Sequence, residues 1–270
     1  MEKASSKHRG KLMGRVRKDR ITQMVHENGF MSSADLAEAF DVSEMTVRRD
    51  LAELEMRGEV RRTHGGAIAG DGGEPAADAV SEPVFDERQR RNSGAKQRIA
   101  RAAAKLIQPG QITALDVGTT TFELGRLLVS DPSRRIFTNN LRIAALDAKA
   151  EVYLLGGRLR SNEKSLVGPV ALEQARKLWF DLVFLGVSSI SSNGIFDYSI
   201  EDTEIKKALI GRATTRVVLA DSSKFDEISL VQIATLNQFD ILVTDRAPEA
   251  ALAADLAATG VKVIVAEGDG

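Results

Sequence analysis

The spacing of apolar residues along the N-terminal quarter of the chain is that of helices. The pattern predicts three short helices, over residues 21–28, 33–40 and 43–58, with capping signals such as Asn28-Gly29 and Ser43 at their ends. One stripe of the third helix is apolar and carries Val47, Leu51 and Leu54. The stretch 59–64 then predicts a short strand pair that Gly65-Gly66 closes.

Residues 67–84 interrupt this pattern and divide the chain. Ala, Gly, Asp, Glu, Ser and Pro dominate the stretch, which lacks the apolar residues of a core, and we expect it to be a linker. The division predicts a basic disordered tail over 1–18, a small domain over 19–66 and a larger domain over 85–270.

Strand-like apolar runs alternate with helical patterns throughout the larger domain, as they do in βαβ units. Expected helices include 96–107, 122–129 and 249–258. The run 182–186 is apolar at nearly every position, which requires burial on both faces and therefore favours a largely parallel sheet. Strands are expected at 112–116, 135–138, 151–155, 182–186, 216–220, 241–244 and 261–265. The sequence thus predicts an α/β fold for the larger domain.

Composition excludes several kinds of site. The 270-residue chain has no cysteine, and its three histidines do not have the spacing of metal ligands, so no metal and no cofactor is expected. It also lacks the roughly 18-residue apolar run that spans a bilayer and the apolar stretch of a signal peptide, and we expect a cytoplasmic protein. The net charge is −1, yet eight of the first 20 residues are Lys or Arg. Whether this basic tail contacts phosphates stays open.

The third predicted helix has the composition of a helix that reads DNA. Opposite its apolar stripe it presents polar and basic side chains, and Arg suits both guanine edges and phosphates. The following hairpin adds further basic residues. A plain helical hairpin with solvated arginines is the alternative. The candidate DNA-binding residues are Ser43, Met45, Thr46, Arg48, Arg49, Arg61, Arg62 and His64.

A resemblance to a known family favours the DNA-binding interpretation. The run FMSSADLAEAFDVSEMTVRRDLAELEMRGEVRRTHGGA, and within it DVSEMTVRRDL followed by RTHGGA, closely resembles the N-terminal signature of DeoR-family regulators. This resemblance implies a winged helix-turn-helix, binding to a double-stranded DNA operator and a repressor role. Activation is the alternative mode. A homodimer or homotetramer would match palindromic half-sites about one helical turn apart.

Glycine and hydroxyl residues follow the ends of several predicted strands. After the strand 112–116, Gly118 and three threonines open a helix, whose N-terminal N–H groups are suited to an anion or are merely capped. Asn139, the loop 156–160 and Lys224 follow other strands, and each has an alternative interpretation as a cap, a turn or a surface charge. Because the carboxyl ends of parallel strands meet at one sheet edge, we expect these loops to converge there as a ligand site.

The family resemblance extends to the larger domain. The segments KQRIARAAAKLI, LDVGTTT, TNNLRIA, LLGGRLR, SLVGP, DLVFLGVSSISSNG and ADSSKF follow the order of the DeoR-family sensor domain, which is similar to ribose-5-phosphate isomerase. The resemblance implies a phosphorylated sugar or polyol as effector, with Thr119–Thr121 and Lys224 at its phosphate and Asp116, Asn139 and Glu201 near its hydroxyls. The candidate effector-binding residues are Asp116, Gly118, Thr119, Thr120, Thr121, Asn139, Gly156, Gly157, Arg158, Glu201 and Lys224.

An isomerase-like enzyme fused to a DNA-binding domain is the second hypothesis. Aldose–ketose isomerisation needs acidic groups poised for proton transfer. The segment that matches the acidic cluster of the isomerases, residues 185–189, holds no carboxylate here. We therefore expect no catalytic residues and no enzymatic activity. The residues do not name the effector, although the stretch 196–202 is expected to contribute to its choice.

Overall fold

The computed structural model describes residues 17–55, 59–63, 66–69 and 84–267. Contacts divide the chain into two compact units, Met1–Ala79 and Val80–Gly270, and each is described by itself. Of the expected basic tail, residues 1–16 lie outside the described part. No helix of the described residues is both long enough and apolar enough to cross a membrane.

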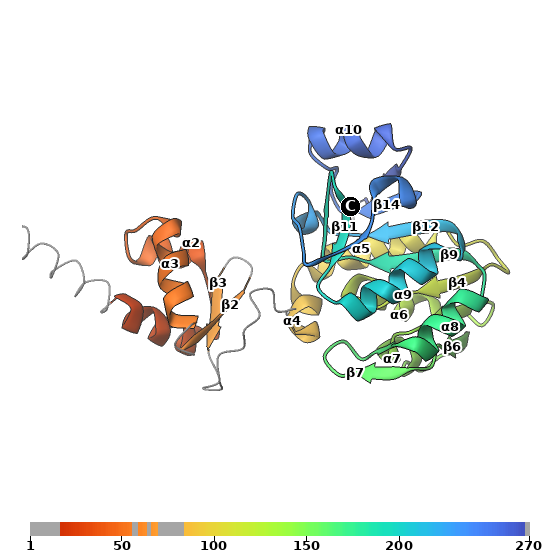
Figure 1. The fold of residues 1–270 in the computed structure, drawn as a ribbon, viewed down its shortest axis with the longest axis horizontal. Helices are drawn as coiled ribbons and strands as arrows, with labels where there is room; N and C mark the ends of the chain where they lie inside the picture. Colours follow the sequence, from red (N-terminus) through yellow and green to blue (C-terminus); the bar gives the residue numbers. More distant parts are fainter. Residues whose placement is uncertain (1–16, 56–58, 64–65, 70–83, 268–270) are drawn as a thin grey trace, which may run out of the picture. The chain divides into compact units, whose positions relative to one another are not determined.

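The N-terminal unit is a helix-turn-helix with a small sheet (Figure 1). A helix over residues 17–28 precedes α2 (Ser33–Ala39) and α3 (Glu44–Glu55), so all three predicted helices are present. Strands β1 (Phe30–Ser32), β2 (Val60–Thr63) and β3 (Gly66–Ala69) form an antiparallel sheet in the order β1-β3-β2. Its core consists of apolar side chains on the faces that the helices turn toward one another: Ile21, Val25, Leu36, Ala37, Val47, Leu51, Leu54, Val60 and Ala67.

The sheet corrects two expectations. We predicted a strand pair inside 59–64, whereas β2 pairs with β3, which comes after the glycines. A Cβ at Gly66 would lie 2.1 Å from the Met31 carbonyl oxygen, so the close pairing of β3 with β1 requires glycine there. Because β3 continues to residue 69, part of the expected linker belongs to the folded unit. The short strand β1 was not predicted.

Two residues assigned to the basic tail form part of the first helix instead. Arg17 Nε contacts Asp50 Oδ2 of α3 at 2.6 Å, and Lys18 forms an ion pair with Glu53 of the same helix. Asp50 is 4% exposed, and this pairing explains how a carboxylate is tolerated among the apolar residues of α3. The described end of the tail therefore holds α3 in place.

The larger unit is built on a seven-stranded parallel sheet with the order β15-β14-β12-β9-β4-β5-β6. All seven predicted strands are present within three residues of their expected bounds. Their bounds are β4 Ile112–Leu115, β5 Arg135–Thr138, β6 Glu151–Leu154, β9 Phe180–Gly186, β12 Ala213–Leu219, β14 Ile241–Thr244 and β15 Lys262–Val265. The parallel α/β architecture expected from the apolar runs is confirmed.

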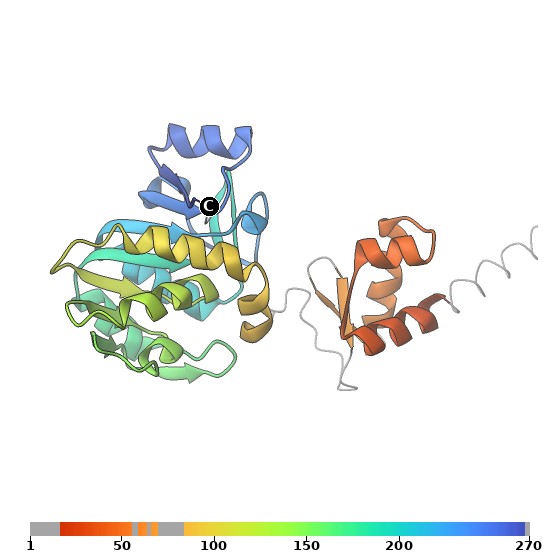
Figure 2. The ribbon, with the colours of Figure 1, turned by 180° about the vertical axis from the view of Figure 1, so that it is seen from behind.

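Helices cover both faces of this sheet (Figures 1 and 2). Helices α5 (Ser93–Ala104), α6 (Thr119–Leu128) and α7 (Leu141–Ala144) pack in one apolar cluster. Helices α8 (Pro169–Lys177), α9 (Ile200–Ile210) and α10 (Ala250–Ala258) pack in the other. Strand β9 supplies Leu182 and Phe184 to the first cluster and Val183 and Leu185 to the second. This alternation is why its sequence is apolar at successive positions.

Smaller elements lie at the carboxyl edge and at one end of the sheet. The hairpin β7 (Arg158–Arg160) and β8 (Ser165–Val167) follows β6, and α4 (Phe85–Arg90) precedes α5. A second sheet has the order β10-β11-β13, from β10 (Ser189–Ser191), β11 (Gly194–Asp197) and β13 (Val231–Ala234). Two 3₁₀ turns, η1 (Ser222–Lys224) and η2 (Leu236–Gln238), complete the unit. The spacing of apolar residues does not predict these short elements.

Candidate functional site

The exposed face of α3 carries the candidate DNA-reading side chains. Met45 is 74% exposed, although an apolar side chain of that size is ordinarily buried when it has no partner. Arg49 is exposed, and its side chain makes no hydrogen bond or ion pair with the rest of the described chain. Arg48 forms an exposed ion pair with Glu44 at 3.4 Å, one turn earlier. Because such a pair contributes little stability, Arg48 remains available to a stronger anion.

The N-terminus of α3 is closed by the two hydroxyl residues expected to contact DNA. The Ser43 oxygen accepts a hydrogen bond from the Thr46 backbone N–H at 3.3 Å, and the two hydroxyls bond each other at 2.9 Å. Ser43 is therefore the N-cap of the helix, the structural role that its residue type favours. Its side chain is exposed, as the start of a groove-reading helix requires.

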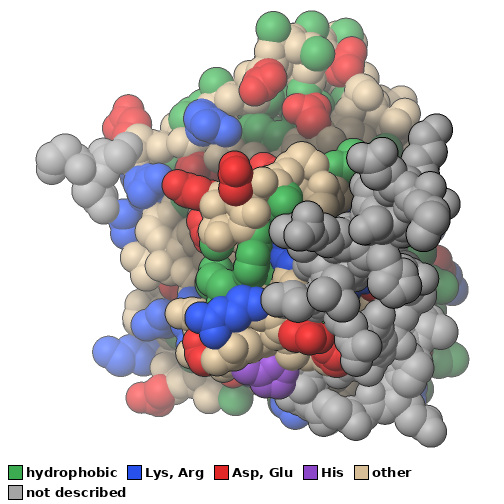
Figure 3. Space-filling view, turned by 90° about the vertical axis from the view of Figure 1, so that its left-hand side faces the viewer, with side chains coloured by type: hydrophobic (Ala, Val, Ile, Leu, Met, Phe, Trp, Pro, Cys, Tyr) green, Lys and Arg blue, Asp and Glu red, His purple; other side chains and the backbone are tan. Residues whose placement is uncertain are grey.

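The candidate residues of the wing differ in their surroundings. Arg61 is exposed, whereas the backbone N–H of Arg62 donates to Glu55 Oε1 at 2.8 Å and its guanidinium lies 3.8 Å from Glu55 Oε2. His64 lies outside the described residues. On the face shown in Figure 3, basic and acidic side chains are interspersed.

In the larger unit, α6 starts at the carboxyl end of β4 and exposes its N–H groups to the sheet edge. Gly118 is its N-cap, with φ +144°, and has no side chain to cap the helix. The first backbone bond of the helix runs from Phe122 N–H to the Gly118 carbonyl at 3.0 Å, so the amides of Thr119, Thr120 and Thr121 have no acceptor in the described chain. All three threonines are buried. Unpaired donors at a buried helix N-terminus are suited to an anion.

A buried cluster of charges lies beside that N-terminus. Lys206 of α9 forms ion pairs with Asp116 and, at 3.1 Å, with Asp197, and it also donates to the Gly186 carbonyl at 2.9 Å. Burial lowers the pKa of Lys206, but the two carboxylates outweigh it and raise that pKa. Burial raises the pKa of Asp116 to about 7, against the opposing effect of Lys206. We conclude that Lys206 is charged and that Asp116 titrates near neutrality.

Only half of the Asp116 carboxylate is used by this cluster. Oδ2 accepts from Lys206 and from the Gly186 backbone N–H at 3.2 Å, while the buried Oδ1 has no partner in the described chain. Asn139 is in a similar state: its Nδ2 donates to the Leu166 carbonyl at 3.4 Å and its buried Oδ1 is unpartnered. Unsatisfied buried acceptors are costly, and they favour a ligand that donates hydrogen bonds.

Other expected effector residues have partners within the protein. Arg158 and Glu201 form an ion pair with each other, and both side chains are exposed. The Gly156 N–H donates to Gln174 Oε1 at 2.8 Å. A Cβ at Gly157 would lie 2.6 Å from the Val167 carbonyl oxygen, so this glycine allows the hairpin to pack closely. These four residues hold the β7–β8 hairpin in place, a role that the loop composition did not distinguish from ligand contact.

Lys224 is the expected cation that remains unneutralised. Burial lowers its pKa, the nearby Arg88 and Arg91 lower it further, and Asp221 partly offsets them. Its ammonium has neither an ion pair nor a hydrogen bond in the described part of the chain, whereas its backbone N–H donates to the Asp221 carbonyl at 3.0 Å. An ammonium with no partner, set among other cations, is a favourable place for an anionic group.

The sequence analysis did not name three charged residues of this edge. Asp197 lies in the stretch 196–202 that was expected to contribute to the choice of effector, and Lys206 lies outside every motif. Only the fold brings the two residues to Asp116. Lys96 lies in the predicted helix 96–107, where a lysine is ordinarily solvated, yet it is 4% exposed. Burial, partly offset by Asp221, lowers the pKa of Lys96 to about 8.

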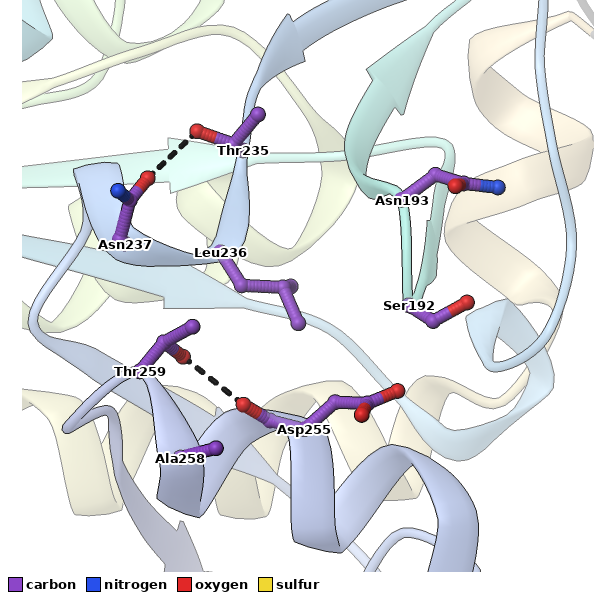
Figure 4. A pocket seen from close by; sticks show the side chains of 8 residues that line it. All are labelled: Ser192, Asn193, Thr235, Leu236, Asn237, Asp255, Ala258 and Thr259. Carbon is purple, nitrogen blue, oxygen red and sulfur yellow. Dashed lines mark hydrogen bonds between the residues drawn. The ribbon is translucent and has the colours of Figure 1, made fainter.

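A separate open pocket of about 460 Å³ lies between the β10–β11 turn, η2 and α10 (Figure 4). Its lining is neutral apart from one carboxylate: Ser192, Asn193, Thr235, Leu236, Asn237, Asp255, Ala258 and Thr259. None of the candidate effector residues lines it, and it offers no cation to an anionic ligand. Within the described ranges no cluster of three His, Cys, Asp or Glu side chains is arranged to hold a metal.

Comparison with known families assigns both units. The DeoR-like helix-turn-helix domain matches residues 17–71, and the DeoR C terminal sensor domain matches residues 91–246. The chain is 33% identical over 251 residues to the HTH-type transcriptional regulator GlpR of Haloferax volcanii, a match that covers 92% of this chain and 96% of that protein. It is 32% identical over 232 residues to the glycerol-3-phosphate regulon repressor of Escherichia coli K12, covering 84% and 89%.

Among solved structures, ribose 5-phosphate isomerase A of Methanocaldococcus jannaschii has 18% identity and a TM-score of 0.36, over 50% of this chain and 55% of that one. A score this low carries no functional argument. The expected similarity to isomerase-type folds therefore stays a resemblance, whereas the parallel α/β architecture follows from the strands themselves.

Proposed function

The chain belongs to the DeoR family of DNA-binding transcriptional regulators, and on this premise we propose that it is a repressor controlled by a phosphorylated sugar or polyol. Like these relatives, it is a regulator of transcription and not an enzyme. Repression is supported by the similarity to the glycerol-3-phosphate regulon repressor of Escherichia coli K12. The operator is read by α3, with the effector bound at the carboxyl edge of the seven-stranded sheet.

One observation carries the effector proposal: buried groups at this edge lack partners within the described chain. The free amides of Thr119–Thr121 and the unneutralised Lys224 suit a phosphate. The unpartnered Oδ1 atoms of Asp116 and Asn139 suit hydroxyl donors. A phosphorylated polyhydroxy compound presents both kinds of group in one molecule. Because ordinary folding pairs such atoms, the presence of several unpartnered groups at one edge of the sheet supports a ligand site.

Thermal unfolding tests this proposal. We expect a compound from a panel of glycerol 3-phosphate, ribose 5-phosphate, glucose 6-phosphate and their unphosphorylated parents to raise the Tm, because a ligand of the native state stabilises it. Lys224→Met should abolish the shift, while Lys207→Met, at an exposed lysine paired with Glu204, should keep it. Shifts of equal size in both variants, or with the unphosphorylated parents, would rule out a phosphate site at Lys224.

The DNA-binding half is tested by selecting duplexes from a random library with the full chain. We expect two related half-sites about one helical turn apart, since a two-fold homo-oligomer places two α3 helices in successive major grooves. A single unrepeated half-site would contradict the symmetric arrangement. Placing the selected sequence upstream of or across a promoter then separates activation from repression.

A further inference from the structure

Helix α4 is the element where the effector site and the connecting segment meet. It begins at Phe85, immediately after the stretch that links it to β3, and it is the first described element of the larger unit. We propose that α4 is the lever through which the effector site controls DNA binding, and that the ion pair between Arg88 and Glu163 is its latch. This inference rests on the effector site proposed above.

The N-terminal end of α4 packs against the helices that open the site. The ring of Phe85, 2% exposed, meets Phe122 edge-on, with centroids 5.7 Å apart and planes at 82°. Phe122 directly follows Thr121 on α6. The guanidinium of Arg142, which is on α7 three residues after Asn139, lies over the Phe85 ring at 3.9 Å from its centroid. A shift of the start of α6 or α7 therefore also moves Phe85, because close-packed side chains transmit displacements.

The middle of α4 is bound to the hairpin that follows β6. Arg88 pairs with Glu163 in the β7–β8 turn, and the side chains are 16% and 2% exposed. The same hairpin contacts Asn139, whose side chain donates to the Leu166 carbonyl. Because Glu163 is almost fully buried, separating the pair leaves a desolvated carboxylate without its cation, a large penalty. The hairpin and α4 are thus expected to move together.

The C-terminal end of α4 is tied to the loop that carries Lys224. Lys96 of α5 donates to the Arg88 carbonyl at 2.6 Å and to that of Arg91, which satisfies the last carbonyls of α4. Asn92, next along the chain, donates to Asp221 Oδ1 at 3.0 Å, at the start of η1. The positive charges of Arg88 and Arg91 also act on Lys224.

Three of the loops that are expected to hold the effector therefore contact α4 itself: the α6 start, the segment after β5 and the hairpin. The start of η1 contacts Asn92, two residues beyond the end of α4. An anion that draws the α6 N-terminus and Lys224 together changes the positions of all four contacts at once. A ligand alters DNA binding only through a difference between two states, and α4 is the element whose position both the ligand and the connecting segment can bias.

Two measurements on the full-length chain test the lever. First, hydrogen exchange of residues 85–90 is followed with and without the duplex selected above, which requires no effector. By linkage, DNA binding should change exchange in α4 of the native chain and leave it unchanged in Arg88→Gln and Glu163→Gln. Identical α4 exchange with and without DNA in the native chain would overturn the proposal.

The second measurement is the ratio of DNA Kd values with and without the compound that gives the largest Tm shift, used at saturation. For the native chain we expect a ratio of about 5–150, typical of allosteric coupling. In Arg88→Gln and Glu163→Gln it should fall to about 1–3, and the double variant should lose no more than either single one. If these variants keep the ratio of DNA Kd values of the native chain, the Arg88–Glu163 ion pair does not have the role that we propose.

Arg160→Gln is the matched control. The Arg160–Asp202 pair is buried to the same degree, with side chains 17% and 2% exposed, and it joins the same hairpin to α9 instead of α4. The Arg160→Gln variant should lower the Tm about as much as Arg88→Gln does. It should keep the ratio of DNA Kd values of the native chain and the response of α4 exchange to DNA. If the ratio of DNA Kd values also falls to about 1–3 in Arg160→Gln, the effect of Arg88→Gln comes from a loosened hairpin and not from α4. If no phosphorylated compound acts on the native chain, the effector proposal fails, and the exchange measurement still decides the lever.

Discussion

Replacement of Lys206 by methionine tests the electrostatics of the buried cluster most directly. Methionine keeps the length and most of the volume of the side chain but removes the ammonium that Asp116, Asp197 and the Gly186 carbonyl share. Lys206 and Asp116 are 1% and 0% exposed, so water cannot replace the lost charge without opening the core. The variant leaves two carboxylates together with no cation between them.

The expected magnitude follows from this burial. Breaking a buried pair by removing one partner costs about 3–5 kcal/mol. In a unit of this size that cost corresponds to a fall in Tm of roughly 6–20 °C. The loss should also depend on pH. With the cation gone, the pKa of Asp116, which burial already raises to about 7, rises further. A raised pKa gives stability that is present at low pH and lost as the pH rises, so the deficit should be smaller at pH 5 than at pH 8.

The chain provides a selective probe and a control. Trp179 is the single tryptophan and lies in the larger unit, where its indole N–H donates to Thr214 at 3.1 Å. Tryptophan fluorescence during urea unfolding therefore reports on this unit alone. Lys207→Met removes an exposed neighbouring lysine and should change stability by no more than about 0.5 kcal/mol. If Lys206→Met unfolds at the same urea concentration as Lys207→Met, the cluster does not stabilise the fold as we describe.

Three further substitutions have defined outcomes. The native chain should lose stability relative to Asp116→Asn as the pH rises from 4 to 7, because the pKa of the Asp116 carboxyl is raised to about 7. The change should be at most about 1.4 kcal/mol per pH unit. Urea unfolding of both proteins at each pH measures it, and a difference that stays constant with pH contradicts it. Arg49→Ala should cost about 1–3 kcal/mol at one base pair of the selected duplex, whereas an equal loss on every single-substituted duplex would mark a phosphate contact. Gly157→Ala, whose Cβ would lie 2.6 Å from a carbonyl oxygen, should lower the Tm, and Gly156→Ala, with its nearest atom at 3.4 Å, should not.

The main elements of the fold could be predicted from the sequence because burial imposes a period on them. Strand β9 alternates between two apolar cores, and its run of apolar residues shows this directly. Strands β7, β8 and β10 have three residues each, of which only one or two are apolar, so no apolar run marks them. Strand β1 was missed for the same reason. Its pairing depends on contact with β3, more than 30 positions later in the sequence.

The position of the candidate site could be predicted from the sequence, but the pairing of its charged side chains could not. Parallel strands bring their carboxyl ends to one edge, so the loops after β4, β5, β6 and β12 could be placed together without coordinates. Which charges neutralise one another there depends on distances between side chains. Arg158 and Glu201 are 43 residues apart and form an ion pair, and Lys206 pairs with Asp116 across 90 residues. Neither pairing leaves a signal in the local sequence.

The distribution of neutralised and unneutralised charge explains why this edge suits a ligand and why α4 suits a lever. Pairs such as Arg88–Glu163 and Lys206–Asp116 are buried, so they fix the loops to one another at a high cost of separation. Lys224 and the amides at the start of α6 are incomplete, so an anion between them gains interactions that the protein alone does not make. Because these buried pairs include one that holds α4, closure on an anion is transmitted along them toward the connecting segment.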